Sequence, residues 1–358
     1  MSVNALLLAG GHGERLWPLS HPESPKQCLP IIDGKSFLRC TFERLDGIVR
    51  PENIYVATGT EIAESILKEV PEIPDKNVII EPHPRDTAPC IGLAALLMAV
   101  KDPETVMIAL PCDHIIKDVD LFKGSLKKAI AAARHGHLVT LGITPEYPAT
   151  EYGYLQCGEE SSDLKQNTGE RFLNIDRFVE KPDLETARRF LESGRYLWNS
   201  GIFIWKARRI LDEIAVHSPR LNQGLDLISK AIGNPGYNAV LEQEFSHFTS
   251  VSIDQAIMEK AHGIVAVEAD FRWRDSGNWD SFATLLATDK DGNAVRGHHI
   301  SIDTTGCVVW SDKPVATMGV DNLVIVSANN AILVCARNRA RDIKQLLNQL
   351  GETKKKET

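Results

Sequence analysis

Short apolar runs rich in β-branched residues alternate with helical patterns through the first half of the chain. The runs lie near or begin at Val3, Asn53, Asn77, Thr105 and His137. Runs of this length and composition are typical of strands buried on both faces of a sheet. The helical candidates between them are Phe37–Ile48, Thr87–Lys101 and Leu121–His135. The alternation predicts right-handed βαβ units and an α/β fold with a mixed, mostly parallel sheet flanked by helices.

The character of the sequence changes after about residue 285. The stretches HISIDTTGCVVW and VDNLVIVSANNAILVC are rich in strand formers and turn signals, and they predict a small β-rich domain of the short β-solenoid type. A helix follows them, because Ile343, Leu346, Leu347 and Leu350 have the spacing of one apolar stripe. We therefore expect one domain over residues 1–285 and a second over residues 286–358.

Composition narrows the range of partners and compartments. The formal net charge of -8 argues against a general nucleic-acid binder, although a local basic pocket for a phosphorylated small molecule is compatible with it. The longest apolar run, Ile91–Val100, is too short to span a bilayer, and the N-terminus shows no signal peptide. Seven scattered cysteines predict free thiols. We expect a cytoplasmic protein without nucleic-acid or membrane partners.

The first expected strand ends in a glycine cluster, in the stretch LLLAGGHGERLWPLSHPESPKQCLP. Gly10, Gly11 and Gly13 let the backbone approach a ligand closely and turn its amide groups toward an anion. A dinucleotide-binding fingerprint would need a third glycine where Leu16 stands. A Walker loop before Gly34-Lys35-Ser36 would need one at Leu29. Neither standard phosphate-binding loop fits.

What remains is the pattern G-G-x-G-x-R-L-x-P-L followed by P-K-Q, which resembles the sugar nucleotidyltransferases. With Trp17 and Gln27 it is similar to their mannose-1-phosphate guanylyltransferase branch, from Leu6 to the C-terminal helix. Its departures are small, with Cys28 in place of an aromatic residue and Cys112 in place of alanine.

The resemblance implies a Rossmann-like, GT-A-like nucleotidyltransferase domain over residues 1–285. It also implies a left-handed β-helix over residues 286–358 that helps to form a homodimer. The implied reaction converts GTP and mannose 1-phosphate to GDP-mannose and diphosphate, with Mg²⁺ as cofactor. Many relatives continue into a cupin domain with isomerase activity. Because this chain ends at Thr358, we expect a single activity.

Nucleotidyl transfer brings two polyanions together, so cations must offset their repulsion. Arg15 suits the triphosphate because its guanidinium group can bind two oxygens at once, and Lys26 supplies a compact charge. Asp113 follows an expected strand in LPCDHII, and Asp275 lies in RWRDSGNWDSF. By the resemblance these two carboxylates hold Mg²⁺, and Asp280 is a weaker candidate.

The resemblance also indicates which residues bind the sugar phosphate. Glu180 of FVEKP would bind sugar hydroxyls, and Lys181 would bind the phosphate. Asn199 of WNSGIF, which can both donate and accept hydrogen bonds, would recognise sugar hydroxyls. Gly153 of EYGY would let the backbone approach the ring. With Asp275, these residues form the expected sugar-phosphate set.

The candidate residues for recognition of the guanine base lie in the stretch EPHPRDTAPC. Glu81 is our first choice to accept hydrogen bonds from guanine, with Asp86 second, and Arg85 would reach the triphosphate or guanine O6. Asp86 or Thr87 would cap the following helix. The expected catalytic residues are Arg15, Lys26, Asp113, Lys181 and Asp275. The expected nucleotide-binding residues are Ala9, Gly10, Gly11, Gly13, Arg15, Lys26, Glu81, Arg85, Asp86, Thr87, Pro111 and Asp113.

Two other functions stay open at this point. The chain could transfer a guanylyl group to another hexose or heptose 1-phosphate, or it could be a catalytically idle sensor of a nucleotide sugar. An idle relative is expected to have lost one of Arg15, Lys26, Asp113 or Asp275, and all four are present. The histidines His12, His83 and His114 lack metal-ligand spacing and are interpreted as structural.

Overall fold

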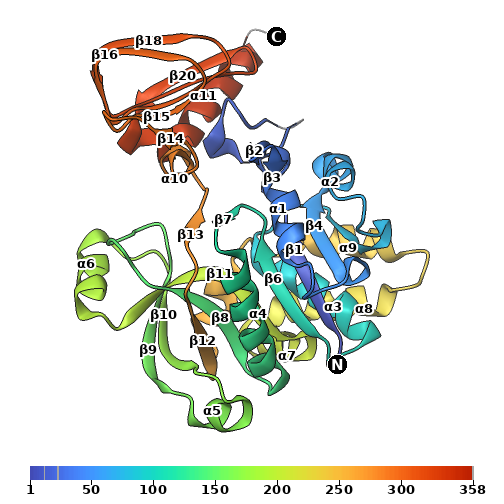
Figure 1. Cartoon of the computed structure of the whole chain (residues 1–358). Helices are drawn as coiled ribbons and strands as arrows, with labels where there is room; N and C mark the ends of the chain where they lie inside the picture. Colours follow the sequence, from blue (N-terminus) through green and yellow to red (C-terminus); the bar gives the residue numbers. More distant parts are fainter. Residues whose placement is uncertain (12, 22–23, 357–358) are drawn as a thin grey trace. The chain divides into compact units, whose positions relative to one another are not determined.

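The computed structural model describes residues 1–11, 13–21 and 24–356, with side chains up to residue 350 (Figure 1). Its largest sheet has nine strands in the order β5-β4-β1-β6-β11-β8-β12-β10-β9. These strands are β1 (Val3–Leu8), β4 (Ile54–Gly59), β5 (Val78–Glu81), β6 (Val106–Pro111), β8 (Leu138–Ile143), β9 (Tyr154–Glu160), β10 (Leu173–Val179), β11 (Tyr196–Lys206) and β12 (Ile264–Ala269).

Strand direction in this sheet follows the expected mixed pattern. β5, β4, β1 and β6 pair in parallel, as do β8 and β12. β10 and β11 run antiparallel to their neighbours, so that β11 joins the two parallel groups. The strands expected near Val3, Asn53, Asn77, Thr105 and His137 are confirmed as β1, β4, β5, β6 and β8. The α/β fold class is thereby confirmed.

Helices cover this sheet. They are α2 (Ala63–Glu69), α3 (Thr87–Lys101), α4 (Val119–Arg134), α5 (Ser162–Thr168), α6 (Leu184–Ser193), α7 (Ala207–His217), α8 (Pro219–Ala231) and α9 (Tyr237–His247). α3 is apolar on nearly all sides because it packs between the strands and α7 and α8, in one hydrophobic cluster. α4 packs against β8, β11 and β12 outside that cluster. None of the helices within the described residues is both long and apolar enough to cross a membrane.

The chain divides into two compact units that are interleaved in sequence. Unit 1 comprises Met1–Gly10, Thr41–Cys112 and Ile116–Trp273, and contains the nine-stranded sheet. Unit 2 comprises Gly11–Cys40, Asp113–Ile115 and Arg274–Thr358. The expected domains were continuous, with a single division between residues 285 and 286. The interleaving arises because side chains from the early segments of unit 2 share a hydrophobic cluster with its C-terminal part.

Unit 2 carries the β-rich segment. Its elements include β2 (Pro30–Ile32), β3 (Lys35–Ser36), α10 (Trp279–Ala283), β14 (Ala287–Thr288), β15 (Ala294–Arg296), β16 (His299–Thr305), β17 (Val308–Ser311), β18 (Val315–Asp321), β19 (Leu323–Ala328), β20 (Ala331–Ala336) and α11 (Ile343–Lys356). α1 (Phe37–Arg44), β7 (His114–Ile116) and β13 (Trp273–Asp275) each run across a boundary between the units.

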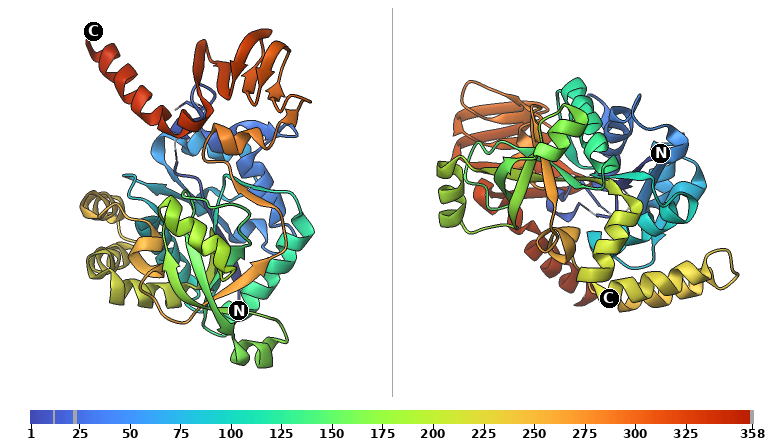
Figure 2. Two further views of the ribbon diagram at one scale, coloured as in Figure 1. Left: turned by 90° about the vertical axis from the view of Figure 1, so that its left-hand side faces the viewer. Right: turned by 90° about the horizontal axis from the view of Figure 1, so that it is seen from below.

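Successive strands of this segment stack in parallel as the rungs of a short β-helix, as Figure 2 shows. β15, β17 and β19 form one face and β16 and β18 another. The cluster inside unit 2 joins Leu16 and Phe37 with Trp279, Trp310 and Ile343. The expected closing helix is confirmed as α11. All seven cysteines are free thiols, as expected.

Steric crowding in the turn after β15 requires a glycine at position 297. Gly297 has φ +106°, and a Cβ atom there would lie 1.9 Å from the carbonyl oxygen of Ser311. Gly319 has φ +63° and open space around it. We expect Gly297→Ala to lower the thermal unfolding midpoint well beyond the effect of Gly319→Ala, which adds only backbone strain of about 1 kcal/mol. Equal midpoints, measured by circular dichroism, would contradict this packing.

Candidate active site

The glycine loop begins where β1 ends, and two polar side chains fix its later part. In unit 2, Gln27 donates from Nε2 to the carbonyl oxygen of Gly11 at 2.5 Å, and Ser20 donates to that of Gly13 at 2.5 Å. Gly13 has φ +68°, and a Cβ atom there would lie 2.4 Å from Cβ of Lys26. Glycine is therefore required both by the backbone and by the closeness of Lys26. His12 lies outside the described residues.

Lys26 is buried, with 5% of its surface exposed. Its Nζ atom lies 2.7 Å from Oδ2 of Asp113 and 5.7 Å from the centre of the Phe37 ring. A buried ammonium group is costly unless it is paired and hydrogen-bonded, so the ion pair and the aromatic ring compensate for lost hydration. The structure thus brings together two predicted catalytic residues that are far apart in sequence.

The carboxyl group of Asp113 is held in its ionised form. Burial alone would raise its pKa, but the charges of Lys26 and His114 outweigh burial and lower the pKa to about 2. Ser276 donates from its hydroxyl group at 2.6 Å, and from its backbone amide at 3.3 Å, to the carbonyl oxygen of Asp113. This contact places the segment of Asp275 beside that of Asp113.

Asp275 lies over the backbone of the next glycine. A Cβ atom on Gly277 would lie 3.1 Å from Oδ2 of Asp275, which explains the glycine in D-x-G. Within the described residues, no three His, Cys, Asp or Glu side chains cluster in a way that could hold a metal ion. Two carboxylates fit Mg²⁺ nonetheless, because this ion usually takes one or two carboxylates from the protein and completes its shell with water and phosphate oxygens. Arg15 is exposed, in the short 3-10 helix η1 (Glu14–Leu16), which the buried Leu16 anchors.

A second group of predicted residues lies in unit 1, where β5 ends. Glu81 is 8% exposed, and its Oε1 atom lies 3.2 Å from where a Cβ atom on Gly10 would stand. Burial raises the pKa of Glu81 to about 7, and the nearby charge of Asp86 adds to the effect, although the thiol of Cys90 counters it. The carboxyl group therefore changes its charge near neutral pH. Ala9 is also fixed here, since its amide donates to the carbonyl oxygen of Ala57 at 2.9 Å.

The start of α3 confirms the expected helix cap and shows an additional contact of Arg85. Asp86 caps α3, accepting from the amide of Thr87 at 2.7 Å, with φ +64°. Arg85 donates to the carbonyl oxygens of Phe245 and Ser246 at 2.8 and 2.7 Å. Arg85 therefore binds the C-terminus of α9, a contact that the sequence did not predict. Backbone carbonyl partners of this kind leave no side-chain signal in a sequence.

The predicted sugar-phosphate residues of unit 1 lie together. A Cβ atom on Gly153 would stand 2.6 Å from Oε2 of Glu180, so a larger residue there would displace the Glu180 carboxylate. Glu180 pairs with Lys181, which has φ +45°. The backbone amide of Asn199 donates to the carbonyl oxygen of Gly153 at 2.8 Å. Pro111, at the end of β6, lies 3.7 Å from where a Cβ atom on Gly201 would stand.

Asp254, which was not among the predicted residues, also belongs to this group, because its Oδ1 atom accepts from Nδ2 of Asn199 at 2.9 Å. Asp254 lies in the stretch VSIDQAIMEK, which matches none of the motifs considered, so no local signal distinguished it from a surface aspartate. It belongs to this group only because the fold brings residue 254 to β11.

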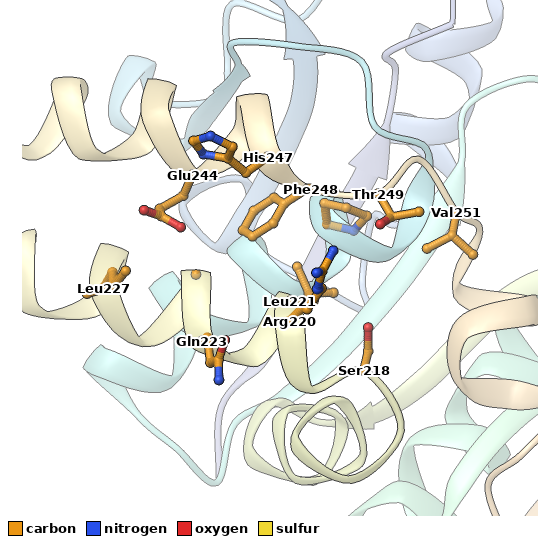
Figure 3. A pocket seen from close by; sticks show the side chains of 12 residues that line it. Ser218, Arg220, Leu221, Gln223, Leu227, Glu244, His247, Phe248, Thr249 and Val251 are labelled. Atoms are coloured by element: carbon orange, nitrogen blue, oxygen red, sulfur yellow. The ribbon is translucent and has the colours of Figure 1, made fainter.

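A separate pocket of about 380 Å³ lies between α8 and α9 in unit 1 (Figure 3). Leu221 and Phe248 form part of its apolar lining, and Arg220, Glu244 and His247 contribute polar groups. None of the predicted site residues lines this pocket. It is therefore distinct from both groups described above.

Comparison with known proteins shows the family to which this chain belongs. A family model described as nucleotidyl transferase matches residues 4–292. The chain belongs to the nucleotidyl transferase family. A second family model, described as the MannoseP isomerase/GMP-like β-helix domain, matches residues 297–350. The β-helix expected at the C-terminus of this nucleotidyl transferase is thereby confirmed.

Similar proteins refine the assignment within the family. A mannose-1-phosphate guanylyltransferase of Klebsiella pneumoniae is 36% identical over 357 residues, which cover 98% of this chain and 74% of the relative. Another, of Escherichia coli strain K12, is 35% identical over 354 residues, covering 96% and 73%. The crystal structure of a protein described as a mannose-1-phosphate geranyltransferase, from Thermus thermophilus, superposes with a TM-score of 0.85 at 32% identity, covering 98% of this chain and 100% of that one. The resemblance to the mannose-1-phosphate guanylyltransferases is confirmed.

The raised pKa of Glu81 predicts a pH-dependent stability. The folded state binds its proton more tightly than the unfolded state does, so the stabilisation is complete below a pH of about 4.5 and is lost as the pH rises to about 7. Glu81→Gln removes this loss, which corresponds to about 3 kcal/mol. We expect the unfolding midpoint of the variant to exceed that of the wild type more at about pH 8 than at about pH 5. Glu61→Gln, on an exposed carboxylate, is the control; a pH-independent difference would contradict the prediction.

Proposed function

We propose that this nucleotidyl transferase is a mannose-1-phosphate guanylyltransferase, which converts GTP and α-D-mannose 1-phosphate to GDP-mannose and diphosphate. Relatives with that name, 33–36% identical over nearly the full chain, support the assignment. The observation that carries it is the ion pair between the buried Lys26 and the half-buried Asp113 beside the glycine loop. It places a fixed cation and an ionised carboxylate together, as a reaction between two polyanions requires.

In the proposed reaction, a phosphate oxygen of the sugar phosphate attacks the α-phosphorus of GTP in line. A new P–O bond forms, the bond from the α-phosphorus to the bridging oxygen breaks, and diphosphate leaves with that oxygen. The attacking oxygen is already anionic at neutral pH, so no protein nucleophile is needed. Arg15 and Lys26 bind the triphosphate, and their charges offset the repulsion between the two substrates.

Asp113 and Asp275 are the residues that would hold Mg²⁺. The lowered pKa of Asp113 fits this role, because its carboxyl group is ionised throughout the neutral range. When bound, the ion supplies positive charge that stabilises the negative charge on the phosphate oxygens. The ammonium group of Lys26 has three N–H donors, so it can bind a phosphate oxygen while it keeps its contact with Asp113.

The remaining assignments concern the base and the sugar. Glu81 accepts hydrogen bonds from the guanine N1–H and N2–H₂ groups, which favour its ionised form. The backbone of Gly10 lies beside its carboxyl group, which supports that placement. Lys181 binds the phosphate of the sugar substrate, while Glu180 and Asn199 bind hydroxyl groups near the backbone of Gly153.

The decisive test is diphosphate release across a grid of nucleoside triphosphates and sugar 1-phosphates. We expect GTP with mannose 1-phosphate to be the best pair. Turnover only with another hexose or heptose 1-phosphate would change the substrate, and no turnover with any pair would indicate a sensor. Asp113→Asn and Asp275→Asn should each lower the rate by at least about a hundredfold. Asp280→Asn, at the weaker carboxylate candidate, is the matched control, and unchanged turnover and magnesium dependence in the first two variants would contradict the metal assignment.

We infer that the protein forms a homodimer through its β-helix and acts in the cytoplasm without nucleic-acid or membrane partners. The face of β16 and β18 exposes Ile300, Ile302 and Met318 by 56%, 54% and 69%. Ile302 and Met318 are register partners, so the exposed apolar groups are contiguous. Seven free thiols support a reducing compartment, and the net charge of -8 supports the absence of nucleic acid.

Met318→Asp tests the dimer. A charge in the middle of an apolar interface is costly to desolvate, so we expect the variant to sediment as a monomer at concentrations where the wild type is dimeric. Val216→Asp, on the exposed surface of α7, is the matched control and should leave the sedimentation coefficient unchanged. A monomeric wild type, or a Met318→Asp variant that remains dimeric, would contradict this interface.

A further inference from the structure

Asp254 begins an unusual element, the π-helix η6 (Asp254–Met258). The amide of Glu259 donates to the carbonyl oxygen of Asp254 at 2.9 Å, which is the i to i+5 bond of that helix type. π-helices are rare and occur often at functional sites. The side chain of Asp254 is partly exposed, whereas Ala256, Ile257 and Met258 are buried. The element thus holds one carboxyl group at the surface of a hydrophobic core.

The contacts of Asn199 determine what it can offer a ligand. Its Oδ1 atom accepts from the hydroxyl group of Thr140 at 3.0 Å and from the amide of Gly201 at 3.2 Å. Its Nδ2 atom donates to Oδ1 of Asp254 at 2.9 Å. Asn199 therefore has one N–H left for a sugar and no longer supplies the acceptor expected of it. The other groups that bind the sugar must come from its neighbours.

Burial, together with a neighbouring carboxylate, favours the protonated form of Asp254. Burial raises its pKa to about 7, the charge of Glu180 adds to this effect, and Lys181 and the amide of Asn199 act against it. The carboxyl group of Glu259 accepts from the amide of Glu180 at 3.3 Å and contributes further negative charge nearby. α7, which packs against η6, adds apolar side chains to the same core.

We propose that Asp254 binds a hydroxyl group of the hexose 1-phosphate: its Oδ1 atom keeps accepting from Asn199, and its protonated Oδ2 atom donates a hydrogen bond to the sugar. The proposal rests on the proposed function, because it takes Glu180 and Lys181 as the sugar-phosphate residues. With the phosphate on Lys181 and the Glu180 carboxylate beside it, a second carboxylate would add repulsion. A protonated Asp254 avoids this and complements Glu180, which accepts.

An asparagine at position 254 can reproduce the hydrogen bonds of a protonated Asp254. In Asp254→Asn, the oxygen of the introduced amide would accept from Asn199, and its nitrogen would donate to the sugar as the protonated carboxyl group does. The affinity of the wild type for the sugar phosphate should fall as the pH rises through about 7, because Asp254 then loses its proton. The affinity of Asp254→Asn should lack this fall, whereas Asp254→Ala should bind the sugar phosphate weakly at every pH.

The experiment measures KM for mannose 1-phosphate and for GTP at about pH 6 and about pH 8.5, from diphosphate release. Asp254→Ala should raise the KM for mannose 1-phosphate by at least about tenfold at both pH values and leave the KM for GTP within about twofold. Asp254→Asn should match the wild type at the lower pH and have the lower KM at the higher pH. Asp212→Asn, on the exposed side of α7, should behave as the wild type. Ionisation of the substrate phosphate is common to all four proteins and cancels from the comparison.

Two results would overturn the proposal. If Asp254→Ala keeps the wild-type KM for mannose 1-phosphate, Asp254 does not contact the sugar. If Asp254→Asn retains the pH response of the wild type, the proton belongs to another group. Calorimetric titration with mannose 1-phosphate separates these outcomes from failure of the proposed function, in which the wild type itself neither binds the sugar phosphate nor releases diphosphate.

Discussion

The buried ammonium group of Lys26 is stable in this fold chiefly because the carboxylate of Asp113 lies 2.7 Å away. Removing the carboxylate partner of a buried cation typically costs about 3–5 kcal/mol, because an uncompensated charge then stays buried. Residues around this ion pair hold its two members in place. Gly13 is a glycine because any side chain would collide with Lys26, and Ser276 holds the backbone of Asp113. Under the proposed function, the same pair supplies the cation for a phosphate oxygen and a carboxylate that would hold Mg²⁺.

Backbone strain marks two of the predicted binding segments. Asp86 and Lys181 are non-glycine residues with positive φ, a conformation that persists only where neighbouring structure imposes it. At Asp86 the constraint is the start of α3, which its side chain caps. At Lys181 it is the short connection between β10 and α6, where Asp183 caps the helix. In both cases a rigid helix follows the strained residue, so the charged side chain is positioned by the element after it.

The sequence predicted five of the nine strands of the large sheet, the helices α1, α3 and α4, and the β-rich C-terminal segment with its closing helix, because these depend on local periodicity and turn residues. It also identified the glycine loop, whose residues are contiguous. It did not predict the interleaved units, which depend on contacts such as that of Leu16 with the C-terminal cluster. Nor did it find the roles of Arg85 and Asp254. Arg85 binds backbone carbonyl oxygens and Asp254 binds a side chain 55 residues away, and neither partner is encoded nearby.

The segment before Asp254 connects the two groups of predicted residues within unit 1. The amide of Val251 donates to the carbonyl oxygen of Arg85 at 3.3 Å, and the amide of Ile253 donates to the hydroxyl group of Thr87 at 2.8 Å. Asp254, the next residue, holds Asn199. The start of α3 and the proposed sugar-binding residues are thus joined by a short run of chain and its hydrogen bonds. Arg85 accepts through its backbone carbonyl oxygen, whereas Thr87 accepts through its side-chain hydroxyl group. The side chain of Thr87 therefore holds the segment before Asp254, in addition to the place of Thr87 at the start of α3.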